Sequence, residues 1–256
     1  MRNKFFKKTL KVFLAIAVWT LVWEAASFLI SDNLKLFLPA PHLVVAALAR
    51  LCATFEFWQS VLFTLLRIFT GFAFGVIGGI LTGTLTAHIK VFDCLLSPAM
   101  RVIRAVPVVS FIILAFLFIK VNFLPVFICF LMVMPLVWQT VHDELTRFDR
   151  NLTEMSEVFK IKGLRKLFYV KFATISDKVL TATVNGIGLA WKSGVATEVI
   201  CSPGIALGYT LSRAKGNINY DDVYAITLAV VLLSIIIELI IKYFYNKTKR
   251  LEKQYD

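Results

Sequence analysis

Four side chains in one largely apolar segment are the residues whose types could do chemistry here. The segment 179–201 carries the amide of Asn185, the indole of Trp191, the ammonium of Lys192 and the carboxylate of Glu198. Charged groups are costly in hydrocarbon, so they normally face the protein interior or a water-filled path. We therefore interpret the four as candidates for lining a polar path through a membrane. The alternative is a structural role in which Lys192 and Glu198 each bond a neighbouring helix; they lie about 120° apart around a helix and are not expected to pair with each other.

The composition supports a membrane setting for that segment. Hydrophobic residues make up 59% of the 256 residues and the mean hydropathy is +0.78, whereas an ordinary soluble domain is about half apolar. The net charge of +12 could suggest nucleic acid. The basic residues lie at the ends of apolar runs, as the positive-inside rule places them, so the lipid bilayer and not nucleic acid is the predicted partner.

Catalytic and metal-binding signatures are missing from the sequence. The four cysteines and three histidines are dispersed, which predicts neither a disulfide framework nor a metal site. A phosphate-cradling P-loop and the common hydrolase motifs are also absent. We therefore predict no catalytic residue in this chain and no cofactor bound by it.

Six apolar runs are each long enough to cross a bilayer, which takes about 20 residues. The sequence predicts an all-α membrane protein with transmembrane helices at about 12–30, 61–86, 102–119, 124–141, 179–201 and 223–241. Lys and Arg concentrate before the first run, in residues 143–178 and after the last run. The positive-inside rule then predicts that both termini and the 143–178 loop are cytoplasmic. The segment from Leu38 to His42 is too Pro-rich to span, and the residues after it, with Val44, Val45, Leu48 and Leu51, are expected to form an external amphipathic helix at the membrane surface.

Glycines recur along the second run. Gly71, Gly75, Gly79 and Gly83 lie at every fourth position and therefore line one stripe of a helix, where another helix can approach closely. Two readings stay open: packing within the chain, or a seam at a moving or dimeric interface. Arg67, near the end of the same run, is expected to anchor the helix at the membrane surface.

The basic loop 143–178 is predicted to hold a short helix. Asn151 can cap its start with Glu154 at the third position, and Gly163 can end it. Its apolar face is predicted to consist of Met155, Val158 and Phe159. A folded unit of this kind outside the bilayer suggests contact with a soluble partner.

This loop resembles the cytoplasmic EAA loop of permease subunits in binding-protein-dependent ABC importers, whose pattern is roughly D-x-x-L-x-E-A-A-x-x-x-G followed by an apolar periodic stretch. Met155 and Ser156 stand for the two alanines, Lys160 stands where the glycine belongs, and Ala173 replaces a proline. The residues that match are, in order, Asp149, Leu152, Glu154, Leu164, Leu167, Val170 and Phe172.

A second register of the loop is possible. It uses Glu157 and Gly163, but it loses Asp149 and Leu152 and misplaces the apolar residues that follow. The first register is preferred. It implies that the residues coupling the chain to an ATPase are Leu152, Glu154, Met155, Ser156, Val158, Phe159, Lys160 and Gly163.

The resemblance extends in order over nearly the whole chain. Within the ABC importer permeases, the chain is most similar to the nitrate, sulfonate and taurine branch. The further matching pieces include Trp23-Glu24, Leu38-Pro39-Ala40-Pro41, Arg104-Ala105-Val106-Pro107, Trp191 with Glu198, and Gly204-Ile205-Ala206-Leu207-Gly208.

The resemblance implies one transmembrane domain over 1–256 in the bacterial cytoplasmic membrane, working as the permease of an ATP-driven importer. Its implied partners are a second, identical permease chain, two ATPase subunits that bind ATP and Mg²⁺, and an external solute-binding protein. The alternative is a secondary transporter or channel subunit that works without an ATPase. The sequence does not specify the solute.

Overall fold

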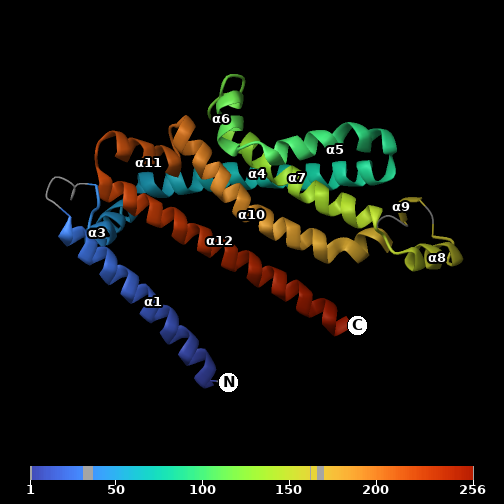
Figure 1. Ribbon diagram of the computed structural model, residues 1–256, viewed down its shortest axis with the longest axis horizontal. Helices are drawn as coiled ribbons and strands as arrows, with labels where there is room; N and C mark the ends of the chain where they lie inside the picture. The colour runs from blue at the N-terminus through green and yellow to red at the C-terminus, as the bar shows by residue number, and fades with distance from the viewer. Residues whose placement is uncertain (1, 31–36, 162, 166–169, 256) are drawn as a thin grey trace.

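The computed structural model describes residues 2–30, 37–161, 163–165 and 170–255, and within them the chain is helical without β-strands (Figure 1). The predicted all-α fold is confirmed. In Figure 1, α8 and α9 lie at one end of the molecule, and α3 and α11 lie toward the other. In chain order the helices are α1 (Arg2–Leu29), α3 (Pro41–Cys52), α4 (Phe55–His88), α5 (Lys90–Ala105), α6 (Val108–Phe116), α7 (Leu124–Thr146), α8 (Arg150–Val158), α9 (Gly163–Arg165), α10 (Ala173–Cys201), α11 (Leu207–Gly216) and α12 (Tyr220–Tyr255).

Three of these helices are each long and apolar enough to cross a membrane: α4, α7 and the Tyr220–Tyr243 part of α12. The pair α5 and α6 passes the same test only when taken together, which gives up to four spans. The described apolar part of α1, Ala17–Leu29, is shorter than a span. The number of six crossings therefore stays a prediction. Five of the predicted spans fall on single helices, namely α1, α4, α7, α10 and α12.

The predicted third span, 102–119, is not one helix. α5 ends at Ala105, α6 begins at Val108, and the two are bent by 104° at the break. Pro107 causes the bend, because a proline lacks a backbone N–H and disfavours helical geometry in the residue before it. Val106 accordingly has an extended backbone, with ψ 135°. α6 itself has nine residues and, at about 1.5 Å per residue, is too short to cross a hydrocarbon core alone.

The glycine stripe of α4 faces α7 of the same chain. A Cβ atom on Gly71 would lie 2.3 Å from the carbonyl oxygen of Val126, and one on Gly79 would lie 2.7 Å from Cβ of Val137. Gly75 and Gly83 meet Val133 and Val141 in the same way. The two helix backbones therefore approach too closely for any side chain between them, and the seam lies inside this subunit.

α10 completes the central packing. Gly194 of α10 lies against Ile68 of α4 and Cys129 of α7, where a Cβ would come within 2.5 and 2.9 Å of their side chains. The buried core between these three helices also contains Val133, Val137, Ala190, Trp191 and Val195. α10 is thus held on the α4–α7 pair, and its polar residues are fixed relative to both.

The segment after the Pro-rich turn forms α3, but its buried side packs on protein. Val44 and Ala47 are buried against Ala225 of α12, and Arg50 forms an ion pair with Asp222. Val45 is exposed. The helix expected after the Pro-rich segment is therefore present with its Val44 side covered by α12, and its position at the membrane surface stays a prediction.

Candidate functional site

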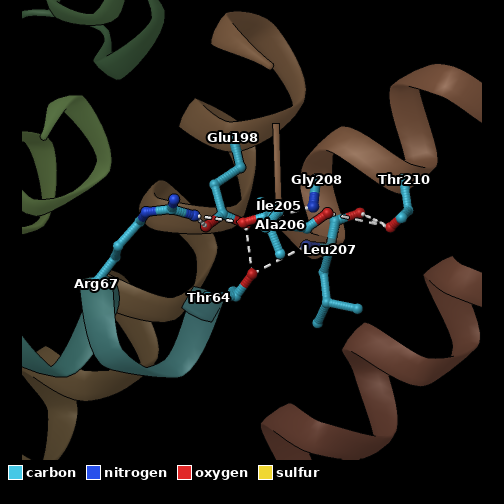
Figure 2. A network of polar contacts seen from close by, with 8 residues as sticks. All are labelled: Thr64, Arg67, Glu198, Ile205, Ala206, Leu207, Gly208 and Thr210. Atoms are coloured by element: carbon cyan, nitrogen blue, oxygen red, sulfur yellow. Dashed lines mark hydrogen bonds and ion pairs between the residues drawn. The ribbon is translucent and has the colours of Figure 1, made fainter. Parts of the chain in front are cut away.

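A buried carboxylate organises the end of α10. The side chain of Glu198 is 0% exposed, and its Oε2 accepts hydrogen bonds from Thr64 Oγ1 at 2.8 Å and from the backbone N–H of Gly208 at 3.3 Å. Figure 2 shows this carboxylate between α4 and the start of α11. A buried charge is costly unless it is paired and hydrogen-bonded, and here the partners come from two other helices.

Arg67 supplies the counter-charge. Its Nη1 donates to the carbonyl oxygen of Ile205 at 2.8 Å and lies 3.5 Å from Glu198 Oε1 (Figure 2). The expectation that Arg67 anchors the helix at the membrane surface is therefore wrong. The guanidinium turns inward because a buried carboxylate and a loop carbonyl offer it stronger partners than the membrane interface does.

The side chains of Thr64 and Glu198, which belong to other helices, cap the N-terminus of α11. The residue before the helix, Ala206, has no side chain that could cap it. Instead, the N–H of Leu207 donates to Thr64 Oγ1 at 2.9 Å, and the N–H of Gly208 donates to Glu198. A carboxylate at a helix N-terminus also interacts favourably with the helix dipole. Gly208 must be glycine for this approach, because a Cβ would lie 2.4 Å from Cβ of Glu198.

The structure thus separates the four predicted pathway residues. Glu198 is used in the network that fixes α11, and Trp191 is buried with its Nε1 donating to the carbonyl oxygen of Val230 at 3.3 Å. Asn185 and Lys192 are exposed and, together with Trp191, line one cavity of about 240 Å³ between α10 and α12. The polar path stays a prediction for all four residues, of which Glu198 and Trp191 also have hydrogen-bond partners within the bundle.

Thr64 is the residue of the network that the sequence did not single out. It is fully buried and lies three positions before Arg67, so both side chains leave α4 on the same face. That i, i+3 spacing of two polar residues within an apolar helix was the available signal. The partners themselves could not be read from the sequence, because Thr64 and Glu198 are 134 positions apart.

The second candidate region is α8, at the opposite end of the molecule from α11 (Figure 1). Three apolar side chains at its C-terminal end are exposed: Met155 is 43% exposed, Val158 is 78% exposed and Phe159 is 70% exposed. Leu152 is partly buried and Ser156 is buried. The face predicted to be apolar is therefore exposed as a patch, which we call the α8 patch and define as Met155, Val158 and Phe159.

Both predicted boundaries of this helix differ from the observed ones. α8 begins at Arg150, so Asn151 lies within the helix and not before it, and Glu154 is not at the third position. Asp149, directly before the helix, is also a residue type that favours the cap position. The helix ends at Val158, five residues before Gly163, which has φ +62° and begins α9.

Lys160 takes over the role expected of Gly163. It has φ +54°, and the N–H of Ile161 donates to the carbonyl oxygen of Ser156 at 2.9 Å. This is the geometry of a helix C-terminus closed by a left-handed residue, a position that is usually glycine. Lys160 is also the residue that stands at the glycine position of the EAA pattern. The backbone expected at the glycine position is therefore present at Lys160 although the glycine is not; the choice of register stays a prediction, because Gly163 of the second register also has a positive φ.

Short connections tie α8 to the central helices. Three residues separate it from the end of α7. Near its base, Lys178 of α10 bonds Glu144 of α7 at 2.6 Å, and Lys171 shares a hydrogen bond of 3.0 Å with His88 at the end of α4. These two contacts join the neighbouring ends of α4 and α7 to α10 and to the segment that leads into it, while α8 follows α7 after three residues. Of the other loop residues that match the EAA pattern, Leu167 lies outside the described residues.

Metal chemistry finds no support in the described part of the chain: no group of three or more His, Cys, Asp or Glu lies together in it. The site residues are thus a polar network inside the helical bundle and an apolar patch outside it.

The sequence of this chain was compared with protein families and with individual known proteins. Residues 75–250 match the family model described as "Binding-protein-dependent transport system inner membrane component". The chain is 25% identical over 234 residues to the protein of Escherichia coli (strain K12) named as an aliphatic sulfonates transport permease, SsuC, covering 88% of this chain and 87% of that protein. It is 23% identical over 237 residues to a protein of Methanocaldococcus jannaschii named as an ABC transporter permease, covering 90% and 88%.

A third relative is the bicarbonate transport system permease protein CmpB of Synechocystis, which is 24% identical over 155 residues, covering 60% of this chain and 55% of that protein. The family match spans more than half of the chain and includes the loop 143–178. The resemblance of this loop to the EAA loop is therefore explained by membership of the family. The chain belongs to the family of inner-membrane components of binding-protein-dependent transport systems: it is a multi-pass permease subunit of an ABC importer, whose ATP hydrolysis takes place in a separate subunit.

Proposed function

We propose that α8 is the element through which this permease is coupled to its ATPase, and that the α8 patch enters a groove of that subunit. The observation that carries the proposal is the exposure of Val158 and Phe159 on a helix that ends outside the membrane-spanning part. Exposed apolar side chains that cluster together mark interaction sites. Lys160 beside the patch suits an acidic rim on the partner.

The proposed assembly contains two identical copies of this chain, two ATPase subunits that bind ATP and Mg²⁺, and an external solute-binding protein. The two copies form the translocation pathway between them, while the seam of glycines stays within each copy. The solute is proposed to be a small oxyanion, because the names of two relatives refer to aliphatic sulfonates and to bicarbonate.

Native mass spectrometry of the purified transporter tests this assembly. The expected mass contains two copies of this chain and two ATPase subunits. A complex with two different permease chains would overturn the proposed homodimer. Purified permease without its partner should not hydrolyse ATP, because its sequence contains no phosphate-cradling loop; ATP hydrolysis by the clean, isolated chain would contradict the proposed division of labour.

We propose further that both termini and α8 are cytoplasmic, and that the turn after α11 is external. Single cysteines test this at two exposed positions, Val158→Cys and Asn217→Cys, in a chain whose accessible Cys52 and Cys94 are replaced by serine. A membrane-impermeant thiol reagent should label Asn217→Cys in intact cells and Val158→Cys only after permeabilisation. Labelling of Val158→Cys in intact cells would reverse the topology.

A further inference from the structure

The groove between α10 and α12 contains more polar groups than the network described above. Asn185 and Lys192 enter it from α10, and Ser234, Glu238 and Lys242 enter it from α12. Its volume of about 240 Å³ is smaller than the pockets of roughly 300–1,000 Å³ that hold drug-sized ligands. A groove of this size suits a solute of only a few heavy atoms.

The depth of Lys192 excludes an ordinary lipid-facing position. The hydrogen bond from Trp191 to Val230 sets Lys192 beside the middle of the Tyr220–Tyr243 span. A charged side chain at that depth is costly in hydrocarbon and therefore faces water or protein. Since Lys192 is exposed in the single chain, the face of α10 and α12 that it occupies must border an aqueous path or a second chain.

The charges of the groove are not balanced within it. Glu238 forms an i, i+4 ion pair with Lys242 on α12, so its carboxylate already has a cation. Lys192 also acts electrostatically on the Glu238 carboxylate, but within residues 37–161, 163–165 and 170–255 no hydrogen bond and no ion pair within 4.0 Å of the Lys192 side chain is found. Lys192 thus adds a second positive charge to a groove with one negative charge.

We propose that Lys192, Asn185 and Ser234 form an oxyanion-binding subsite on the translocation path. This inference rests on the proposed function, because it assumes that the groove opens to the path. The ammonium, the side-chain amide and the hydroxyl are all hydrogen-bond donors, and a cationic donor binds an anionic oxygen more strongly than a neutral donor does. The subsite binds the negative oxygens of a solute such as a sulfonate or bicarbonate as it passes between the two copies.

Uptake by the complete transporter in proteoliposomes tests the subsite, with labelled ethanesulfonate and labelled bicarbonate as the two probes. Lys192→Met should reduce uptake of the transported probe about tenfold to a hundredfold, because a charge-assisted hydrogen bond is lost. Lys192→Arg should keep most of the uptake, since it keeps the positive charge. Lys120→Met, which removes an exposed cation between α6 and α7 that does not line the groove, is the matched control and should change uptake less than about threefold.

A purely structural role for Lys192 predicts a different pattern. If Lys192 only neutralised Glu238, the double variant with Lys192→Met and Glu238→Gln would recover uptake, whereas the proposed subsite predicts no recovery. Normal uptake by Lys192→Met, or recovery in the double variant, overturns the inference. A wild-type transporter that assembles with its ATPase but moves neither probe also overturns it, together with the oxyanion solute proposed above, while the proposed coupling through α8 stands. Failure of the wild-type chain to bind an ATPase contradicts the proposed function itself.

Discussion

Phe159→Asp is expected to abolish solute transport and ligand-stimulated ATP hydrolysis together, while the permease still inserts into the membrane at normal abundance. Phe159 is 70% exposed and lies outside the helices that could span a membrane, so its replacement removes no packing from the bundle. If the α8 patch enters a groove of the ATPase, the new carboxylate would be forced into an apolar contact without a partner. Loss of a buried aromatic anchor costs about 2 kcal/mol or more, which lowers affinity by roughly 30-fold.

The measurement is co-purification of the ATPase with the tagged permease, followed by uptake and ATPase assays on the same preparation. Phe159→Leu is the matched control, since it keeps an apolar side chain at the same position, and it should retain binding and most of the transport. A permease with Phe159→Asp that still binds its ATPase and transports normally would show that α8 is not the coupling element. The family assignment would then stand without its proposed contact.

The proposed coupling through α8 gives a role to the contacts between the helix ends that lie next to it. The ion pair between Lys178 and Glu144 and the contact between Lys171 and His88 join the ends of three helices near α8. At the far end, Glu198 binds α11 to α4 and α10. Under the proposed coupling, a movement of α8 would pass to α7 through the three-residue connection between them. The closely packed α4 and α7 would then move together.

The sequence predicts the long helices well, because their apolar runs exceed the thickness of a hydrocarbon core and few other structures can satisfy such a run. It also predicts that the stripe of Gly71, Gly75, Gly79 and Gly83 meets another helix. The sequence does not say which helix packs there, because the glycine spacing describes only the surface of α4 and not that of its partner. The close approach to Val126 and Val137 of α7 depends on tertiary packing.

Three local predictions failed for identifiable reasons. The predicted third span, 102–119, included Pro107, although a proline and the residue before it disfavour a helix. The position of this proline in the sequence already indicated a break. The start of α8 was misplaced because Asp149 and Asn151 are both good cap residues and lie two positions apart. Arg67 was read from its nearness to a span end, whereas its partner Glu198 is 131 positions away. The first error could have been avoided, but the third could not.

The glycine seam yields the second prediction with a large expected effect. Gly79→Ala should destabilise the permease by about 1–3 kcal/mol, the usual cost of overpacking a core. A Cβ at this position would lie 2.7 Å from Cβ of Val137, 2.8 Å from the carbonyl oxygen of Met134 and 3.0 Å from the backbone nitrogen of Trp138. Two of these three atoms belong to the backbone of α7, so the clash can be relieved only by separating the helices.

The neighbouring glycine provides the control on the same helix. A Cβ on Gly78 would meet only side-chain atoms, Phe130 Cε2 at 3.2 Å and Met134 Cγ and Sδ at 3.6 Å. These atoms can turn aside, and alanine is a better helix former than glycine by about 1 kcal/mol. Gly78→Ala should therefore leave the thermal unfolding temperature unchanged or raise it, while Gly79→Ala lowers it.

Thermal unfolding of the two variants in detergent, measured beside the wild type, decides between the two readings of the seam. Adding Gly71→Ala to Gly79→Ala should lower the unfolding temperature further, because the Gly71 Cβ would lie 2.3 Å from the carbonyl oxygen of Val126. If the seam lay instead between two copies of the chain, Gly79→Ala would weaken dimer formation and leave the unfolding of the separated monomer unchanged. That outcome would contradict the α4–α7 packing, because a backbone clash inside the monomer cannot depend on whether a second copy is bound.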